Sequence, residues 1–157
     1  MALSFLATVE DLFRRLSLGM PRIDATGIVR LRVDALAVNL SDDGRGACRI
    51  EGRIGTLPAA GPARAAAVRA ILRATPGFLL ANEAGVFLRS EGARGEALVA
   101  FSSHPLAQNA PERLIGRIED VLTLVEFHAH ALTDTGAPAR AQRAAREEIE
   151  DAVIFRL

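Results

Sequence analysis

The sequence predicts an α+β domain in which helices pack on a twisted antiparallel sheet. We expect two copies of this domain to form a homodimer. Stretches with apolar residues at a 3.6-residue period lie near the start, in the middle and towards the end of the chain. Short stretches with alternating apolar and polar residues lie between them, separated by turn sequences. The predicted order is helix, three antiparallel strands, helix, two strands and a long helix, which at 157 residues fits one domain.

The first helix is expected over residues 5–16, because its apolar side chains recur with the helical period and Gly19 and Pro21 end it. Two strands follow, over residues 29–33 and 36–40. Their apolar positions change from odd to even numbers across Asp34-Ala35, so we expect a tight turn or bulge there. The turn sequence of residues 41–44 precedes a third strand that carries Cys48, Ile50 and Ile54.

The second helix is expected over residues 63–74, where Thr75-Pro76 breaks or restarts it. Residues 78–81 fit either a helical turn or a strand, so the sequence leaves the length of this helix open. Strands are expected over 86–89 and 97–103, and a long helix over 111–132. Residues 1–136 therefore form the predicted domain. Residues 137–157 form a separate C-terminal tail in which Arg–Glu pairs at i,i+4 would support a short helix.

Composition excludes several functions. All 19 basic residues are Arg, so no chemistry that requires Lys is available, including a Walker-type phosphate loop and a Schiff base. The net charge is zero and Trp and Tyr are absent, which argues against nucleic acid as the partner. A single Cys suits a reducing cytoplasm. We expect no signal peptide and no membrane insertion, because the apolar stretches are short.

A search for catalytic and metal sites yields none. His128 and His130 stand two apart on a helix and point about 200° from each other, and His104 lies in a predicted loop before a proline. Cys48 falls in a predicted strand with no histidine near it in the sequence, which fits a buried structural thiol. The acidic residues of the tail fit a solvated helix face. We therefore predict no catalytic residue, no metal and no cofactor.

The order of the elements resembles the class I chaperones of bacterial type III secretion, the Tir-chaperone (CesT-like) family associated with virulence. The resemblance spans roughly residues 8–132, and Pro76-Gly77 departs from it within the second helix. The stretches that carry it are residues 12–19, 27–34, 38–40, 71–72, 80–82, 85–88, 97–101, 104–106 and 114–125.

The resemblance implies a cytoplasmic homodimer without enzymatic activity. Such a chaperone binds the extended N-terminal segment of one or more secreted effectors and presents it to the secretion apparatus, whose ATPase is a further candidate partner. Binding of this kind uses apolar grooves together with strand edges that accept main-chain hydrogen bonds from the guest. The predicted groove residues are Leu12, Leu16, Leu18, Val29, Leu31, Leu36, Val38 and Ile50.

The predicted dimer interface lies on the second helix and a nearby strand. Small alanines allow two helices to approach closely, and the branched side chains between them supply apolar area. The interface residues are Ala67, Val68, Ile71, Leu72 and Phe87. The alternative function is a small regulatory or nucleic-acid-binding module that contacts phosphates through Arg30, Arg32, Arg49 and Arg53.

Overall fold

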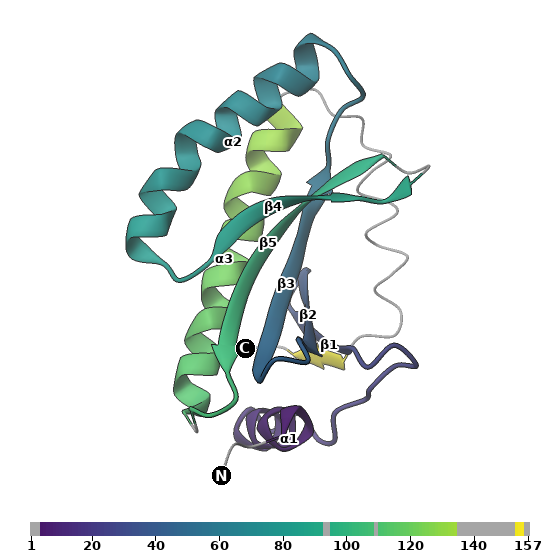
Figure 1. Cartoon of the computed structure of the whole chain (residues 1–157), viewed down its shortest axis with the longest axis vertical. Helices are drawn as coiled ribbons and strands as arrows, with labels where there is room; N and C mark the ends of the chain where they lie inside the picture. Colours follow the sequence, from purple (N-terminus) through teal and green to yellow (C-terminus); the bar gives the residue numbers. More distant parts are fainter. Residues whose placement is uncertain (1–3, 93–94, 109, 135–152, 156–157) are drawn as a thin grey trace.

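The computed structural model describes residues 4–92, 95–108, 110–134 and 153–155. These residues form three helices and a mixed sheet. The order of the elements along the sequence follows the predicted one, with one further strand near the end of the chain (Figure 1). The elements are α1 (Phe5–Arg15), β1 (Val29–Val33), β2 (Leu36–Asp42), β3 (Ala47–Thr56), α2 (Pro62–Ala81), β4 (Gly85–Ser90), β5 (Glu96–Pro105), α3 (Pro111–Asp134) and β6 (Val153–Phe155).

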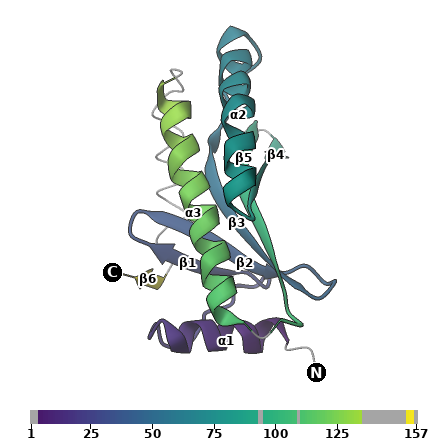
Figure 2. The ribbon, with the colours of Figure 1, turned by 90° about the vertical axis from the view of Figure 1, so that its left-hand side faces the viewer.

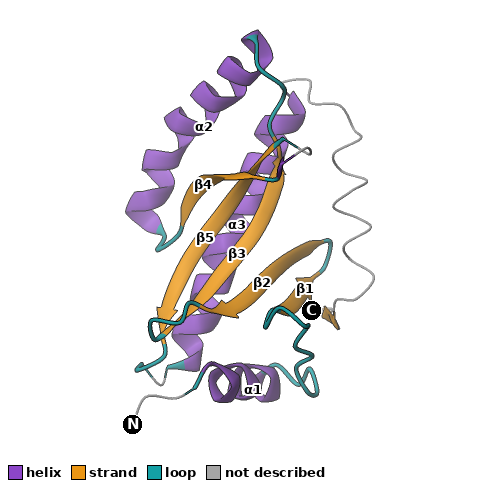
Figure 3. Ribbon diagram, turned by 45° about the vertical axis from the view of Figure 1, so that its right-hand side comes forward, coloured by secondary structure: helices purple, strands orange, loops and turns teal. Residues whose placement is uncertain are grey.

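The strands lie in the order β4-β5-β3-β2-β1-β6. Neighbouring strands from β4 to β1 are antiparallel, whereas β6 runs parallel to β1. Every antiparallel pair except β3–β5 consists of strands that are consecutive in the sequence. Between β3 and β5 the chain forms α2 and β4. Figure 3 shows how strongly the sheet twists between the end bearing β4 and the end bearing β1.

α3 lies along one face of the sheet, α2 runs beside α3, and α1 lies across the end formed by β1 and β2 (Figure 2). α3 packs mainly against β3 and β5 and also contacts β2, and the backbone of β3 approaches it closely at Gly52. A Cβ built on Gly52 would lie 2.5 Å from Val125 Cγ2 and 3.0 Å from Val121 Cγ1. The opposite face, which faces the viewer in Figure 1, is not covered by any described helix.

α1 is held at both ends. The hydroxyl of Ser4 accepts a hydrogen bond from the backbone N–H of Ala7 (3.2 Å), which satisfies one free donor of the first turn. At the other end Ser17 and Gly19 adopt positive φ, and the chain leaves the helix there. Arg15 pairs with Glu112, so this end of α1 is tied to the start of α3.

α2 is one continuous helix of 20 residues, which settles the question that the sequence left open. Pro76 lies inside it and residues 78–81 form its last turn, so the break expected at Thr75-Pro76 is wrong. Proline lacks the N–H that a helix interior uses. Here Pro76 is exposed, and the Thr75 hydroxyl donates a hydrogen bond to the carbonyl of Ile71 (2.8 Å).

Two further expectations are settled by the backbone. Val33 pairs with Leu36, so Asp34 and Ala35 form a two-residue hairpin loop in which Asp34 has φ 53°. The predicted tight turn is therefore confirmed. His104 lies within β5 and pairs with Cys48 of β3, so its placement in a loop is wrong. β5 continues to Pro105 because the pairing with β3 extends that far.

Candidate protein-binding site

The eight predicted groove residues lie in α1, in the chain just after it and in β1, β2 and β3, but most of them are interior. Leu12, Val29, Leu31, Val38 and Ile50 are at most 1% exposed and belong to the hydrophobic core. They form the floor of this region and do not contact solvent. Leu16, Leu18 and Leu36 are half-buried and pack against that core. Of the predicted set, these three are the side chains that a partner can reach in this structure.

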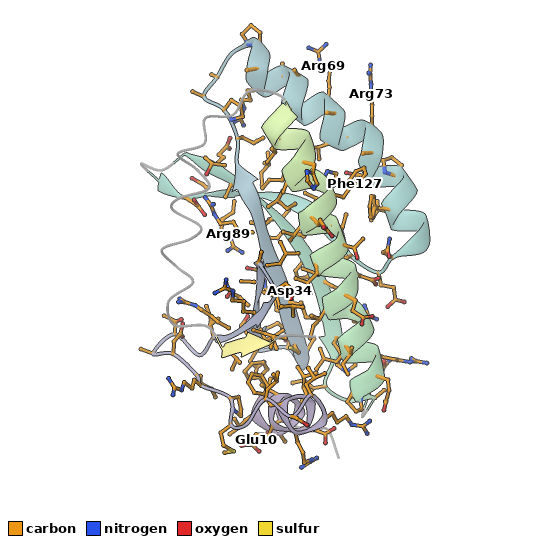
Figure 4. All side chains as sticks on the ribbon, turned by 180° about the vertical axis from the view of Figure 1, so that it is seen from behind. Glu10, Asp34, Arg69, Arg73, Arg89 and Phe127 are labelled. Atoms are coloured by element: carbon orange, nitrogen blue, oxygen red, sulfur yellow. The ribbon has the colours of Figure 1, made fainter. Side chains whose placement is uncertain are left out.

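The loop between α1 and β1 adds exposed apolar side chains in the same region. Met20 is 77% exposed and Ile23 is 45% exposed. A shallow pocket of about 520 Å³ lies beside them, and α1 and this loop line it with Glu10, Arg14, Ser17, Gly19, Met20 and Pro21. Glu10 marks its place on α1 in Figure 4. We call Leu16, Leu18, Met20, Ile23 and Leu36 the α1 surface. It combines apolar contact area with charged groups at its rim.

The loop is ordered by Asp24, whose carboxylate accepts hydrogen bonds from the N–H groups of Thr26 (2.8 Å) and Ile28 (3.0 Å). The Thr26 hydroxyl also donates to it, and this bond lowers the pKa of Asp24 most. The turn brings Ile23 back into a bridge with Val29, the first residue of β1. The turn therefore holds Ile23 beside the start of β1.

The predicted dimer residues divide between two environments. Ala67 and Ile71 face the core of the chain itself, and Val68 is half-buried against it. Leu72, by contrast, is 65% exposed, and Leu79 two turns further on is 56% exposed. Figure 4 shows Arg69 and Arg73 pointing away from the body on the same helix. The outward side of α2 thus presents two leucines that the chain itself does not cover.

Phe87 lies apart from these residues, on the face of the sheet that α3 leaves open. Its ring meets that of Phe101 edge to face, with 6.1 Å between centroids. The guanidinium groups of Arg49 and Arg89 lie 5.8 and 5.4 Å from the Phe87 centroid, and both pair with Glu51. The open face therefore carries an arginine–aromatic cluster whose counter-charge is the half-buried Glu51.

The cysteine and the histidines lie in contrasting environments. Burial raises the pKa of the Cys48 thiol to about 12, so a thiolate does not form at neutral pH. His128 is fully buried, and neither ring nitrogen has a hydrogen-bond partner among the described residues, whereas His130 is exposed. Among the described residues, no three His, Cys, Asp or Glu side chains come together as metal ligands. Within that same part of the chain no helix is long and apolar enough to cross a membrane.

Several surface residues escaped the sequence reasoning. Met20, Ile23, Leu79 and Phe127 are exposed apolar side chains that were not among the predicted site residues. Met20 and Ile23 follow a glycine and a proline in an irregular segment, which is a weak signal for exposure. Leu79 could not be assigned a face while the end of α2 was uncertain.

No protein-family model matches the chain, and no curated protein matches it. Solved structures do. A chain of the HopA1–SchA chaperone–effector complex superimposes with a TM-score of 0.61 at 19% identity, covering 78% of this chain and 91% of that one. The Yersinia pestis type III secretion chaperone SycH, solved in complex with a stable fragment of YscM2, superimposes with a TM-score of 0.54 at 16% identity. The match covers 82% of this chain and 99% of that one.

A different kind of protein also shares the architecture. YbjN from E. coli, described as a candidate transcription regulator, superimposes with a TM-score of 0.51 at 11% identity, covering 91% of this chain and 96% of that one. At these identities the likenesses show the fold alone. They confirm the predicted fold class, in which a helix, an antiparallel sheet and a long closing helix pack together.

Proposed function

We propose that this chain is a non-enzymatic class I type III secretion chaperone. It binds the extended N-terminal segment of one or more effectors, keeps that segment competent for secretion and delivers it to the secretion apparatus. The observation that carries the proposal is the fold, shared with SchA and SycH over about four fifths of the chain. The secretion ATPase is a candidate second partner.

The surface chemistry supports protein binding. The α1 surface offers half-buried and exposed apolar side chains next to a sheet edge, the two elements that an extended guest requires. Exposed apolar groups that lie together generally indicate an interaction site. A guest that is unfolded before binding must lose conformational entropy, so it needs a large contact area. The α1 surface would then form only part of the contact.

The test begins with a pull-down from bacteria that contain an intact secretion system, with the bound proteins identified by mass spectrometry. The N-terminal segment of a bound protein is then purified, and its affinity for the chain is measured by calorimetry. We expect that segment alone to bind, and the amount of that protein in the secreted fraction to fall when the chain is deleted. Bound proteins that are not secreted would contradict the proposal.

Matched variants separate binding from folding. Met20→Asp and Ile23→Asp each place a charge at an exposed apolar position of the α1 surface, and we expect each to weaken effector binding at least tenfold. Leu88→Asp is the control, because Leu88 is 45% exposed and lies on β4, at the opposite edge of the sheet from β1 and β6. Equal losses of affinity for all three variants would show that the α1 surface has no special role.

The second candidate is the regulatory or nucleic-acid-binding module, which the likeness to YbjN favours. Its proposed phosphate contacts are already engaged within the chain. Arg30 lies 3.6 Å from Asp24, Arg32 donates to the carbonyl of Asp34 (2.9 Å), Arg49 pairs with Glu51, and Arg53 lies 3.0 Å from Glu91. Binding to duplex DNA or to RNA that weakens steeply with salt would support this candidate instead. We expect none.

A homodimer completes the proposal. Leu72 and Leu79 provide an apolar surface on the outward side of α2, and a second copy of the chain is the partner that we propose for it. Phe87 and the residues around it on the open sheet face remain a proposed extension of this interface.

A further inference from the structure

The outer edge of β1 is covered by two separate pieces of the chain. Ile23 bridges to Val29 at the start of the strand. β6 covers the other end, where Leu31 pairs with Val153, Arg32 with Ile154 and Val33 with Phe155. Without β6, the N–H and C=O groups of Leu31–Val33 that point outward would be open to pairing with another chain.

β6 differs from every other strand of the sheet. It has three residues and pairs with β1 in parallel, whereas all other pairs in the described sheet are antiparallel. It also lies near the end of the chain, with residues 135–152 between it and α3. Parallel pairing is slightly less stable per residue, and so short a ladder contributes few hydrogen bonds. β6 is therefore the strand of this sheet that a competitor displaces most easily.

The covered edge adjoins the α1 surface. Ile23 and Leu36, at opposite ends of β1, belong to that surface, and the side chains of Leu31 and Val38 form its floor. Figure 1 shows β6 in yellow at the same end of the molecule as α1. A guest strand that pairs with β1 would therefore also reach the exposed apolar side chains.

We propose that β6 is an internal occupant of the guest site, so that an extended guest strand must displace the chain's own C-terminal strand to pair with β1. The proposal rests on the function proposed above, because it identifies the β1 edge as the main-chain contact of the guest. Since β6 is tethered, it acts at an effective concentration on the order of millimolar. Weak peptides are thereby excluded, and a guest with a long contact competes successfully.

Proline substitutions in the full-length chain provide the test. Successive residues of a strand direct their N–H groups to opposite sides. One variant is the double substitution Val153→Pro with Phe155→Pro, and the second is Ile154→Pro. Because proline has no N–H, one of these two variants removes the donors that face β1. The other variant is the matched control. The probe is a fluorescent peptide with the sequence EDAVIFRL, which corresponds to residues 150–157. Anisotropy measures its binding, and hydrogen exchange measures the protection of the β1 amides.

We expect one of the two variants to bind the peptide at least tenfold more tightly than the unaltered chain does, with faster exchange at Leu31–Val33. Equal peptide affinity and equal exchange in both variants and the unaltered chain would overturn the proposal. A measurement without substitution guards against misfolding: millimolar peptide should speed exchange at Val153–Phe155 in the unaltered chain while β1 stays protected. Fast exchange at Val153–Phe155 before peptide is added would also overturn it.

These outcomes are independent of effector binding. If the peptide test succeeds but the chain captures no secreted protein, the displaceable β6 is supported and the chaperone function is contradicted. If the chain binds an effector segment and neither proline variant changes the affinity, the chaperone function is supported and competition by β6 is contradicted.

Discussion

Gly52 determines how closely α3 lies on the sheet. A methyl group at this position would overlap Val125 and crowd Val121. We expect Gly52→Ala to destabilise the fold by about 1–3 kcal/mol, since an overfilled core forces neighbouring side chains and backbone to move. For a domain of this size each kcal/mol lowers Tm by about 2–4 °C, which thermal unfolding followed by circular dichroism will measure.

Gly116 in α3 is the matched control for this substitution. Its Cβ would meet nothing within 4 Å, so alanine there should stabilise the helix by roughly 0.5–1 kcal/mol. If Gly52→Ala raised Tm as Gly116→Ala does, the close packing of β3 on α3 would be contradicted.

His128 makes stability depend on pH. It is buried between α2 and α3, with ring centroids 6.1 Å from Phe78 and 5.2 Å from Phe127, and burial lowers its pKa below 6.5. The unfolded chain therefore binds a proton more readily than the folded chain. The contribution of neutral His128 to the free energy of unfolding is fully present above pH 6.5 and decreases as the pH falls towards the folded-state pKa. Below that pKa the total loss is about 1.4 kcal/mol for each pH unit by which burial lowers the pKa.

The measurement is denaturant unfolding at pH 7.5 and at pH 5.5. Burial also lowers the pKa of His104, so part of the loss is expected to remain in a His128 variant. We expect His128→Leu to reduce the difference between the two pH values. An equal difference in the variant and in the unaltered chain would exclude His128 as a source of the pH dependence.

At the scale of elements, α2 has one side in the core and one side without a partner. We expect Leu72→Asp with Leu79→Asp to convert a dimer to a monomer without lowering Tm by more than a few degrees, because both side chains are largely exposed in the protomer. Size-exclusion chromatography with light scattering measures the mass, and thermal unfolding measures the stability.

Ile71→Asp is the contrasting variant, since Ile71 is 6% exposed and a charge there should unfold the protomer itself. Leu6→Asp is the control for surface charge, because Leu6 is 44% exposed on α1. A monomeric unaltered chain at micromolar concentration would refute the proposed dimer.

The order of the elements could be predicted because periodicity and turn residues are local signals. β1 and β2 alternate clearly, and Asp34-Ala35 marks their turn. The length of α2 could not be predicted, since local propensity places a break at Pro76 while packing of Ile71 and Phe78 against the core and α3 continues the helix. β6 could not be predicted either, because pairing with β1 joins residues about 120 positions apart and no local pattern encodes it.

At the scale of the whole molecule, residues 137–157 remain a predicted tail, and the expected short helix of residues 143–150 lies outside the described residues. We expect truncation after Ala137 to leave the fold intact and to shift Tm by only a few degrees, because every core residue in the described part of the chain lies at or before Leu132. The uncovered β1 edge should increase concentration-dependent association, which light scattering measures. Failure of the truncated chain to fold would place the tail in the core.

The candidate site was only partly accessible to sequence reasoning. The pattern located apolar positions on α1 and β1–β3, but exposure depends on how α1 and α3 cover them. Leu12 and Leu16 occupy neighbouring turns of one helix, yet Leu12 is fully buried and Leu16 is half-buried. Met20 and Ile23 are exposed because the Asp24 turn holds their loop at the sheet edge, and that turn depends on hydrogen bonds rather than on hydrophobic pattern.

Because Cys48 is buried, the rate at which its thiol reacts reports how often the sheet opens. The thiol lies in β3, between β2 and β5, with no solvent exposure, and the sequence contains no other cysteine. The chain also lacks Trp and Tyr, so it has little intrinsic fluorescence to report on folding. A maleimide can alkylate Cys48 only while the centre of the sheet is open. The rate of labelling, followed by mass spectrometry, therefore times each opening of the sheet in native conditions and shows directly how much a bound guest slows it.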